Sequence, residues 1–383
     1  MHLTLLSRSS FLIFAVCHVT AAGPSFEPQV IDPEVEIGYG VVVGDVDGDG
    51  KEDILLADKR SFSWFRNGDW KEFTMAKNLT LRDNVCIAAA DINDDGQVEV
   101  AVGGQWNPGE TSDAEQSGAV FFLDRPEDPK QTWTPVKLPH EPTTHRMRWE
   151  NPQSGWILFV LPLHGIGNIK GEGENSANVM SLRPDVEKLA DPGSWSDWMR
   201  GTAGHITHNL DSTRGALYIA SAEGVKYLDL DTDKERLYIS RENSSPPTRG
   251  AGEVRNGKNF ITAIEPLHGN DLVVYRGNPN DGWKRHLLTD QLAEGHALAI
   301  GDMNGDGRED IVYGWRKPDA DGKVGLGIFL QTEGGGWESS WKSTDLVAVE
   351  DLKLADLDAD GKLDIVAAGR STNNLVIFWN RSE

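Results

Sequence analysis

Residues 44–57, with the sequence GDVDGDGKEDILLA, decide the fold of this chain because the stretch recurs. Variants of it occupy residues 90–103 (ADINDDGQVEVAVG), 301–314 (GDMNGDGREDIVYG) and 355–368 (ADLDADGKLDIVAA). Each copy joins an apolar run of small residues to a β-branched run through a loop rich in Asp and Gly. A unit that returns along a chain in this way indicates a repeat architecture.

Each unit continues with two further runs that have the composition of β-strands. In the first unit an aromatic run at residues 62–65 is followed by a run that begins with a Trp at residues 70–73. Short strands separated by turn residues indicate an all-β fold. Four strands in a unit of roughly 45–55 residues are typical of one blade of a β-propeller.

The middle of the chain lacks the Asp-rich loop but keeps the same order of strands, at residues 145–160, 205–220 and 253–275. The expected fold is an all-β, seven-bladed β-propeller with four-stranded blades, which residues 23–383 form as a single domain. The blades are predicted to begin near residues 30, 80, 140, 200, 250, 291 and 345.

The charge balance of the chain disfavours nucleic acid as a partner. Its 383 residues include 60 Asp and Glu against 37 Lys and Arg, so the formal net charge is −23. A protein that binds nucleic acid usually carries a basic face. The Asp-rich loops account for part of the acidity, and bound cations would offset it; solubility alone is the simpler explanation of the same excess.

The N-terminal residues 1–22 have the features of a secretory signal peptide. Arg8 supplies a positive charge, residues 11–19 are mostly apolar, and the small residues at 19–22 suit a cleavage site. The apolar run is too short to cross a membrane. We therefore expect a secreted or periplasmic protein without a membrane span, in which Cys86 is the one cysteine left after cleavage.

The Asp-rich loops have the spacing of a calcium site. Acidic or amide side chains stand at positions one, three, five and nine of each loop, and alternate positions on a tight turn converge. Carboxylates and carbonyls are the hard oxygen ligands that Ca²⁺ takes. An Asx-rich turn without metal would produce the same composition. The predicted structural calcium ligands are Asp45, Asp47, Asp49 and Asp53; Asp91, Asn93, Asp95 and Glu99, which fit slightly less well; Asp302, Asn304, Asp306 and Asp310; and Asp356, Asp358, Asp360 and Asp364.

These loops also fix the direction of each strand. If each loop joins the first and second strands of a blade, then the first strand begins and the second strand ends at the opposite end of the propeller, which we call the mouth. The motif Pro-Leu-His-Gly occurs at residues 162–165 and 266–269, each time at the expected end of a second strand. Five of the ten histidines are thereby predicted at the mouth, namely His145, His164, His205, His268 and His296.

Neutral imidazoles that converge suggest Zn²⁺ or another divalent metal, and they also suit acid–base chemistry near neutral pH. A single histidine at a strand end is more often structural, so the prediction rests on the convergence. His208 lies three residues from His205, and strand alternation assigns it to packing or to support of the site. The assigned roles are metal ligands His145, His205 and His296; catalytic groups His164, His268, Tyr39 and Arg316; and substrate-binding groups Trp106, Trp315, Arg370, Glu223 and Glu350. His164 and His268 are assigned as base and acid or, alternatively, as further metal ligands.

The repeats resemble the FG-GAP/VCBS repeats of integrin-α-like β-propellers over nearly the whole mature chain. The histidine motifs, which are HRMRW at residues 145–149, the two Pro-Leu-His-Gly motifs and GHA at 295–297, resemble those in the propeller domain of fungal aldos-2-ulose (anhydrofructose) dehydratases. This second resemblance implies elimination of water from a keto-sugar and a metal site in the propeller. Those enzymes continue into cupin domains, whereas this sequence ends at Glu383, so we expect any activity that needs a cupin to be absent.

Two functions from different classes follow. The first is a carbohydrate lyase or dehydratase, which carries out β-elimination on a keto-sugar or a uronate-containing saccharide at the mouth. In this hypothesis a metal or Arg316 polarises the carbonyl or carboxylate beside the proton that is lost. The second is a non-catalytic lectin or adhesion propeller, for which calcium loops and rim aromatics suffice. Distinctive residues gather in the third to sixth blades, which favours a single central site.

Overall fold

A computed structural model describes residues 23–169, 172–200, 204–213, 215–232 and 234–382. The predicted signal peptide at residues 1–22 lies outside this range. Among the described residues, no helix has the length and apolar character needed to cross a membrane.

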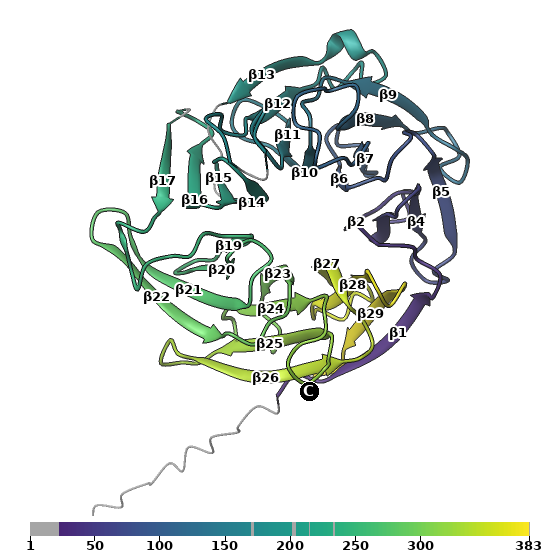
Figure 1. Cartoon of the computed structure of the whole chain (residues 1–383). Helices are drawn as coiled ribbons and strands as arrows, with labels where there is room; N and C mark the ends of the chain where they lie inside the picture. The colour runs from purple at the N-terminus through teal and green to yellow at the C-terminus, as the bar shows by residue number, and fades with distance from the viewer. Residues whose placement is uncertain (1–22, 170–171, 201–203, 214, 233, 383) are drawn as a thin grey trace, which may run out of the picture.

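The described residues form seven β-sheets arranged around a central channel, as the sequence predicts (Figure 1). Each blade has four antiparallel strands in chain order from the centre to the rim, except that the last blade borrows its outer strand. The fifth blade carries in addition the short parallel strand β18 (Ser244–Ser245). The first three blades comprise β2 (Gly40–Gly44), β3 (Asp53–Ala57), β4 (Ser61–Phe65) and β5 (Glu72–Lys77); β6 (Cys86–Ala90), β7 (Glu99–Gly104), β8 (Ala119–Asp124) and β9 (Thr134–Leu138); and β10 (Thr144–Glu150), β11 (Ile157–Pro162), β12 (Val179–Arg183) and β13 (Ser196–Arg200), with the 3-10 helix η1 (Pro192–Ser194) before β13.

The remaining blades follow the same plan. They comprise β14 (Thr207–Thr213), β15 (Ala216–Ser221), β16 (Gly224–Asp229) and β17 (Glu235–Ile239); β19 (Glu253–Asn256), β20 (Ile261–Glu265), β21 (Asp271–Asn278) and β22 (Gly282–Thr289); β23 (Gly295–Gly301), β24 (Asp310–Trp315), β25 (Gly325–Gln331) and β26 (Trp337–Thr344); and β27 (Val349–Ala355), β28 (Asp364–Gly369) and β29 (Leu375–Asn380).

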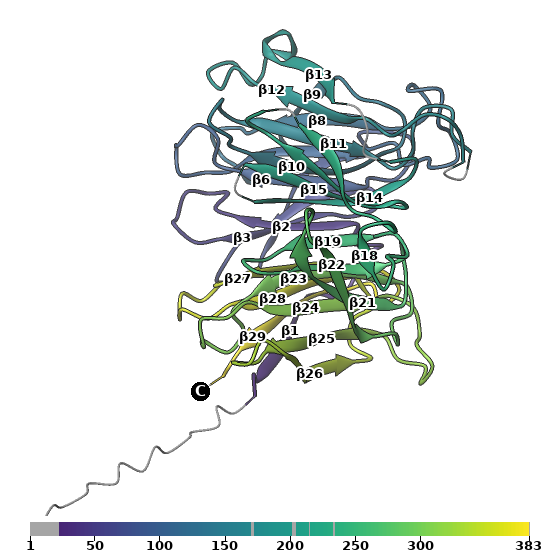
Figure 2. The same cartoon turned by 90° about the vertical axis from the view of Figure 1, so that its left-hand side faces the viewer.

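The two ends of the chain close the ring. Strand β1 (Phe26–Asp32) pairs antiparallel with β29 and so supplies the outer strand of the seventh blade (Figure 2). Residues near 30 therefore belong to the last blade, whereas the sequence analysis assigned them to the first. The difference arises because a strand's partner cannot be read from its composition. Closure of this kind protects the edge of β29 from pairing with another chain.

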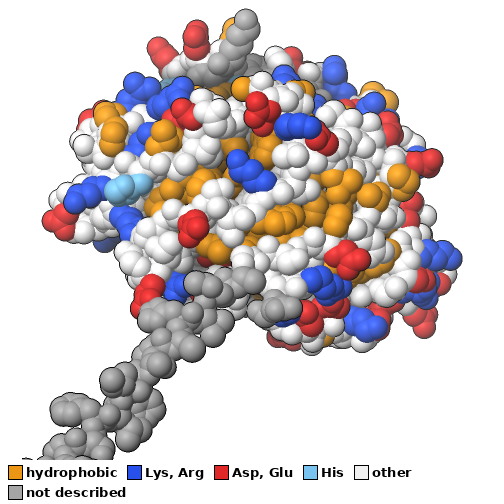
Figure 3. Space-filling model, turned by 90° about the horizontal axis from the view of Figure 1, so that it is seen from below, with side chains coloured by type: hydrophobic (Ala, Val, Ile, Leu, Met, Phe, Trp, Pro, Cys, Tyr) orange, Lys and Arg blue, Asp and Glu red, His pale blue; other side chains and the backbone are white. Residues whose placement is uncertain are grey.

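The core lies between the faces of neighbouring blades. Between the first two blades, Leu55 and Trp64 of the first sheet pack with two residues of the second blade. These are Val100 in β7 and Trp133, which directly precedes β9, and all four side chains are almost completely buried. Apolar side chains therefore fill the spaces between blades, while the inner strands remain free to line the channel. The surface carries mixed charges, and Figure 3 shows acidic and basic side chains interspersed around a band of hydrophobic ones on one side of the rim.

Four inner strands contain a bulge at the same place. The strands β10, β14, β23 and β27 are each seven residues long, and each shifts register just after its first residue. An extra residue in one strand bends it and re-aims the side chain. The second residues of these strands are His145, His208, His296 and Glu350. The bulges thus lie at the mouth end, opposite the turns that join first and second strands.

Candidate metal centre in the central channel

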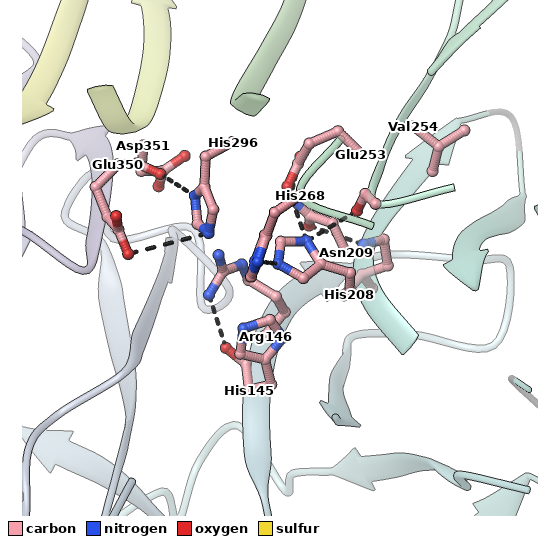
Figure 4. A network of polar contacts seen from close by, with 12 residues as sticks. His145, Arg146, His208, Asn209, Glu253, Val254, His268, His296, Glu350 and Asp351 are labelled. Atoms are coloured by element: carbon pink, nitrogen blue, oxygen red, sulfur yellow. Dashed lines mark hydrogen bonds and ion pairs between the residues drawn. The ribbon is translucent and has the colours of Figure 1, made fainter. Parts of the chain in front are cut away.

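Four histidines meet where the bulged strands face one another (Figure 4). His145, His208 and His296 come from β10, β14 and β23, and His268 follows β20 in the fifth blade. His208 is the centre of the group, because its ring centroid lies 4.9 Å from that of His145, 4.3 Å from that of His268 and 5.0 Å from that of His296. We call these four residues the histidine cluster.

Hydrogen bonds orient two of these rings. Nδ1 of His208 donates to the carbonyl of Gly252 at 2.9 Å and lies 3.2 Å from a carboxylate oxygen of Glu253. Nδ1 of His296 donates to the carbonyl of Glu350 at 2.6 Å. Because a neutral imidazole carries one N–H, these bonds leave Nε2 of both rings with a free lone pair. Such support of the second nitrogen is typical of metal-binding histidines.

The free nitrogens converge. One ring nitrogen from each of His208, His268 and His296 lies within 4.8 Å of the others. Nε2 of His208 and Nε2 of His268 are 2.5 Å apart, a distance with no room for two N–H groups. A shared proton satisfies this contact, whereas two ligands of one Zn²⁺ would have to stand farther apart, because the ligands are arranged tetrahedrally at about 2.0–2.1 Å from the ion. Three imidazole nitrogens are a ligand set that Zn²⁺ and similar divalent ions accept, so the residues fit such an ion.

The cluster is held in its neutral form. Burial lowers the pKa of His145, His208 and His296 well below the usual value, and the nearby guanidinium groups of Arg146 and Arg316 add to the effect. Part of the His268 side chain is exposed, yet burial among its neighbours, His208 and the charge of Arg316 also lower its pKa. Neutral imidazoles offer lone pairs without having to release a proton.

Charged groups frame the cluster on the side of the seventh blade. Arg316 donates to both carboxylate oxygens of Glu350 at 2.8 and 3.0 Å and to Glu294 at 3.0 Å. Its third nitrogen lies 3.5 Å from Nδ1 of His268. Arg370 also donates to Glu350, at 2.8 Å. Glu350 thus orients the predicted site residues Arg316 and Arg370 through ion pairs. Of these two, Arg316 also lies next to His268 of the histidine cluster.

The structure brings together His145, His268 and His296 among the predicted histidines, but it places His164 and His205 elsewhere. Nδ1 of His205 is 2.6 Å from Glu223, which also accepts from the backbone N–H of His205. His164 is buried beside the backbone of Ile206, and burial lowers its pKa. His205 is thus no part of the group of nitrogens that could share a metal.

The sequence assigned His208 to packing or to support of the site, whereas the structure places its ring at the centre of the histidine cluster, next to the bulge in β14. Strand alternation does separate His208 from His205, but His208 is the one that faces the channel. His145, His208, His296 and Glu350 all stand five residues before the end of their strands, at Glu150, Thr213, Gly301 and Ala355. In the sequence, counting five residues back from the end of each inner strand would have identified His208. Aligning the histidines of different blades with one another selected His205 instead.

The other predicted mouth residues have separate environments. Trp106 stacks on His145 with 5.1 Å between the ring centroids. The hydroxyl of Tyr39 donates to Asp83 at 3.0 Å, and burial together with that carboxylate raises the pKa of Tyr39, so the phenol stays protonated. Trp315 is not available to a substrate, because its ring is part of the apolar core between the fifth and sixth blades and its indole N–H donates to the carbonyl of Lys323 at 2.8 Å.

The Asp-rich loops share a backbone clamp. In the first loop, the buried carboxylate of Asp53 accepts from the N–H of Val46 at 2.9 Å and from the N–H of Asn67 at 2.7 Å. Asp310 and Asp364 accept two backbone N–H groups in the same way, from Met303 and Gln331 and from Leu357 and Asn380.

The residues of the first loop also fit a cation. Oxygens of Asp45, Asp47 and Asp53 lie within 4.8 Å of one another, and one buried oxygen of Asp47 has no hydrogen-bond partner among the described residues. Asp356, Asp358 and Asp360 form a similar group in the last loop. An orphaned carboxylate oxygen beside two others is what a bound Ca²⁺ would satisfy.

A cavity of about 500 Å³ runs along the inner strands of all seven blades. Its lining includes Arg146, Asn209 and Asp351, each of which directly follows a bulge residue. The cavity therefore begins beside the histidine cluster. Its volume lies in the range of pockets that hold small molecules.

Residues 26–102 match the FG-GAP-like repeat family. The chain is 23% identical over 313 residues to aldos-2-ulose dehydratase of Phanerodontia chrysosporium, a match that covers 72% of this chain and 33% of that protein. The chain thus spans about a third of the length of the curated relative that it matches.

Solved structures with little sequence identity share the fold. A chain in the crystal structure of a mitotic checkpoint complex superposes with a TM-score of 0.58 and 11% identity, over 99% of this chain and 98% of that one. A chain in the crystal structure of BBS1N in complex with ARL6DN gives 0.57 and 10%, over 94% and 97%. The protein is therefore a seven-bladed β-propeller in which residues 26–102 match an FG-GAP-like repeat, and it is distantly similar to an aldos-2-ulose dehydratase.

Proposed function

We propose that this chain is a carbohydrate lyase or dehydratase that carries out a metal-assisted β-elimination at the histidine cluster. The observation that supports the proposal is the convergence of ring nitrogens from His208, His268 and His296 beside a cavity of about 500 Å³. The distant similarity to aldos-2-ulose dehydratase supports the reaction class. The predicted signal peptide supports a secreted or periplasmic location.

In this proposal His208, His268 and His296 hold a divalent ion, Zn²⁺ or another metal that accepts imidazole ligands. When bound, such an ion supplies Lewis-acid polarisation of a carbonyl or carboxylate oxygen. This ligand set replaces the predicted set of His145, His205 and His296, because His205 is paired with Glu223. The Asp-rich loops are proposed to bind Ca²⁺ in a structural role.

His145 is the proposed base. Its ring lies against His208 and Trp106, and its buried Nδ1 has no hydrogen-bond partner among the described residues. Its lowered pKa keeps the imidazole neutral with a lone pair available, and in this proposal that lone pair accepts the proton from the carbon beside the carbonyl. The electrons of that C–H bond form the C=C bond, and the C–O bond to the leaving group breaks. The imidazolium returns the proton to the departing oxygen, so the sugar loses one water.

Arg316 is the proposed electrostatic partner of this step. Negative charge develops on the carbonyl oxygen as the proton leaves, and a fixed guanidinium stabilises it without reorganising. Its ion pairs with Glu294 and Glu350 hold it in place next to His268. Arg316 keeps the role that the sequence assigned to it, whereas His145 replaces His164 and Tyr39 as the base.

The test compares two histidine variants. We expect that zinc-loaded protein forms an enone, detected by ultraviolet absorbance, from a keto-sugar or an unsaturated product from a uronate polymer. His208→Ala should lose both bound zinc, measured by mass spectrometry of the dialysed protein, and turnover. His205→Ala, the matched control, should keep its zinc.

Equal zinc content and equal turnover in both variants would contradict the proposal. Binding to many glycans on an array without any turnover would instead favour the non-catalytic lectin.

A further inference from the structure

The lining of the central cavity contains more cationic than acidic side chains, although the protein as a whole is strongly acidic. Its lining includes four cationic side chains but two carboxylates, Asp211 and Asp351. The formal net charge of the whole chain is −23. The cationic side chains of the lining are Arg146, Arg148, Arg255 and Lys353.

The two carboxylates of the lining are already engaged by the backbone. Asp351 accepts from the N–H groups of Val41 and Leu352, both at 2.9 Å, and it is also paired with Nζ of Lys353 at 3.2 Å. Asp211 accepts from the N–H of Asn256 at 2.9 Å. The backbone N–H groups thus occupy some of the carboxylate lone pairs, and fewer remain for hydrogen bonds from the cationic side chains.

The guanidinium groups are poorly paired by comparison. Each guanidinium has five N–H donors. The bond of Arg146 is to the carbonyl of the preceding residue at 3.1 Å. The closest carboxylate to Arg148 is Asp211 at 3.4 Å, and the closest to Arg255 is Glu253 at 3.7 Å. Arg255 also donates to the carbonyl of Val254 at 2.6 Å, and Arg148 to that of Leu210 at 3.5 Å. Among the described residues, most of the five donors of each group nevertheless have no partner and can serve a ligand in the cavity.

The cations also repel one another. Burial lowers the pKa of Lys353, and the charges of Arg255 and Arg148 lower it further, although Asp351 opposes them. Burial raises the pKa of Glu150 to about 7 although Arg148 lowers it, so this carboxyl neutralises Arg148 incompletely at neutral pH. An anion in the cavity would relieve this repulsion.

We propose that the cavity beside the histidine cluster binds the carboxylate of an acidic sugar, with Arg146, Arg148 and Arg255 as its contacts. The inference rests on the proposed function, because it selects a uronate over a neutral keto-sugar as the substrate of the same site. Arg148 stands two residues beyond Arg146 along β10, a step of about 6–7 Å in a strand. A carboxylate held there leaves the rest of a sugar ring close to His145 and the metal ligands.

The experiment measures binding by titration calorimetry to the full chain loaded with zinc. The probes are glucuronate, the neutral methyl glucoside and inorganic phosphate. Glucuronate should bind tightly enough to measure, and methyl glucoside should bind at least tenfold more weakly, because a charge-assisted hydrogen bond is worth about tenfold to hundredfold in affinity.

The variants separate the anion site from the metal site. Arg148→Met should weaken glucuronate binding by about tenfold to hundredfold and leave zinc content unchanged, while Arg148→Lys should restore part of the affinity. Arg66→Met, which removes a surface arginine paired with Asp69, is the matched control and should have no effect. Circular dichroism and a melting curve check that each variant is folded.

Three results would overturn the inference. They are equal affinity of the wild type for glucuronate and methyl glucoside, an unchanged glucuronate affinity in Arg148→Met, and binding of phosphate alone, which would indicate a simple anion site. Arginine-dependent glucuronate binding by a protein that binds no zinc would uphold the inference while refuting the proposed metal chemistry.

Discussion

The clamp made by Asp53 should be worth a large part of the stability of the protein. The side chain is 0% exposed and accepts two backbone N–H groups, from Val46 and Asn67, at 2.9 and 2.7 Å. Asp53→Ala would leave both donors buried and unpaired, at a cost of about 1–3 kcal/mol each. The expected loss is about 2–6 kcal/mol, against a typical total of about 5–15 kcal/mol for a folded protein.

Urea unfolding followed by tryptophan fluorescence measures this loss, first in a chelator and then in Ca²⁺. Asp49→Ala is the control, because Asp49 is exposed and accepts one bond from Lys51 in the same loop. In chelator its effect should stay within about 0.5 kcal/mol. In Ca²⁺ the wild type should gain stability, and both variants should gain less.

The stability of the calcium-free protein should also depend on pH with a defined sign. Burial raises the pKa of Asp53 to about 7, above the value of about 3.9 in an unfolded chain. The folded state therefore binds the proton more tightly, so this contribution is complete below about pH 4 and is lost as the pH rises through about 7. Ca²⁺ binds the ionised form and should offset the loss.

A free-energy loss below about 1 kcal/mol for Asp53→Ala in chelator would refute the clamp. Identical unfolding curves with and without Ca²⁺ would refute the calcium sites but leave the clamp intact.

Three further predictions concern the rest of the molecule. Glu253→Gln should weaken zinc binding by about tenfold to hundredfold, because Glu253 supports Nδ1 of His208. Competition with a chelating dye measures the zinc affinity, and Glu235→Gln, a change at an exposed residue, should leave it unaltered. Cys86 is 3% exposed and burial raises the pKa of its thiol to about 12, so it should resist iodoacetamide at pH 8 until urea unfolds the protein, and rapid labelling of the native state would contradict its burial. Deletion of residues 23–32 removes β1 and uncovers β29, so the truncated protein should aggregate on size-exclusion chromatography, whereas a stable monomer would show that the closing strand is dispensable.

The fold was largely predictable because each blade repeats its own signals. The Asp-rich loops mark the turn between the first and second strands, and the strands on both sides appear where the pattern indicates. The partner of β1 was not predictable, because pairing of the two ends of the chain depends on ring closure and leaves no local signal.

The candidate site was predictable in part. The sequence placed His145, His268 and His296 at one end of the channel, and the structure brings them together. It missed His208 because it matched His205 to the channel position, whereas the residue that faces the channel is His208, beside the bulge in β14. It included Trp315 because a position at a strand end does not reveal whether the ring turns into the core.

The central claim is that His208, His268 and His296 hold a divalent metal. The most direct test is the crystal structure of the zinc-loaded protein, with an anomalous difference map calculated from data collected at the zinc absorption edge. The account predicts a peak in contact with the Nε2 atoms of all three histidines. A peak beside His205 and Glu223, or a histidine cluster without a peak in protein that has been soaked in zinc, would contradict it.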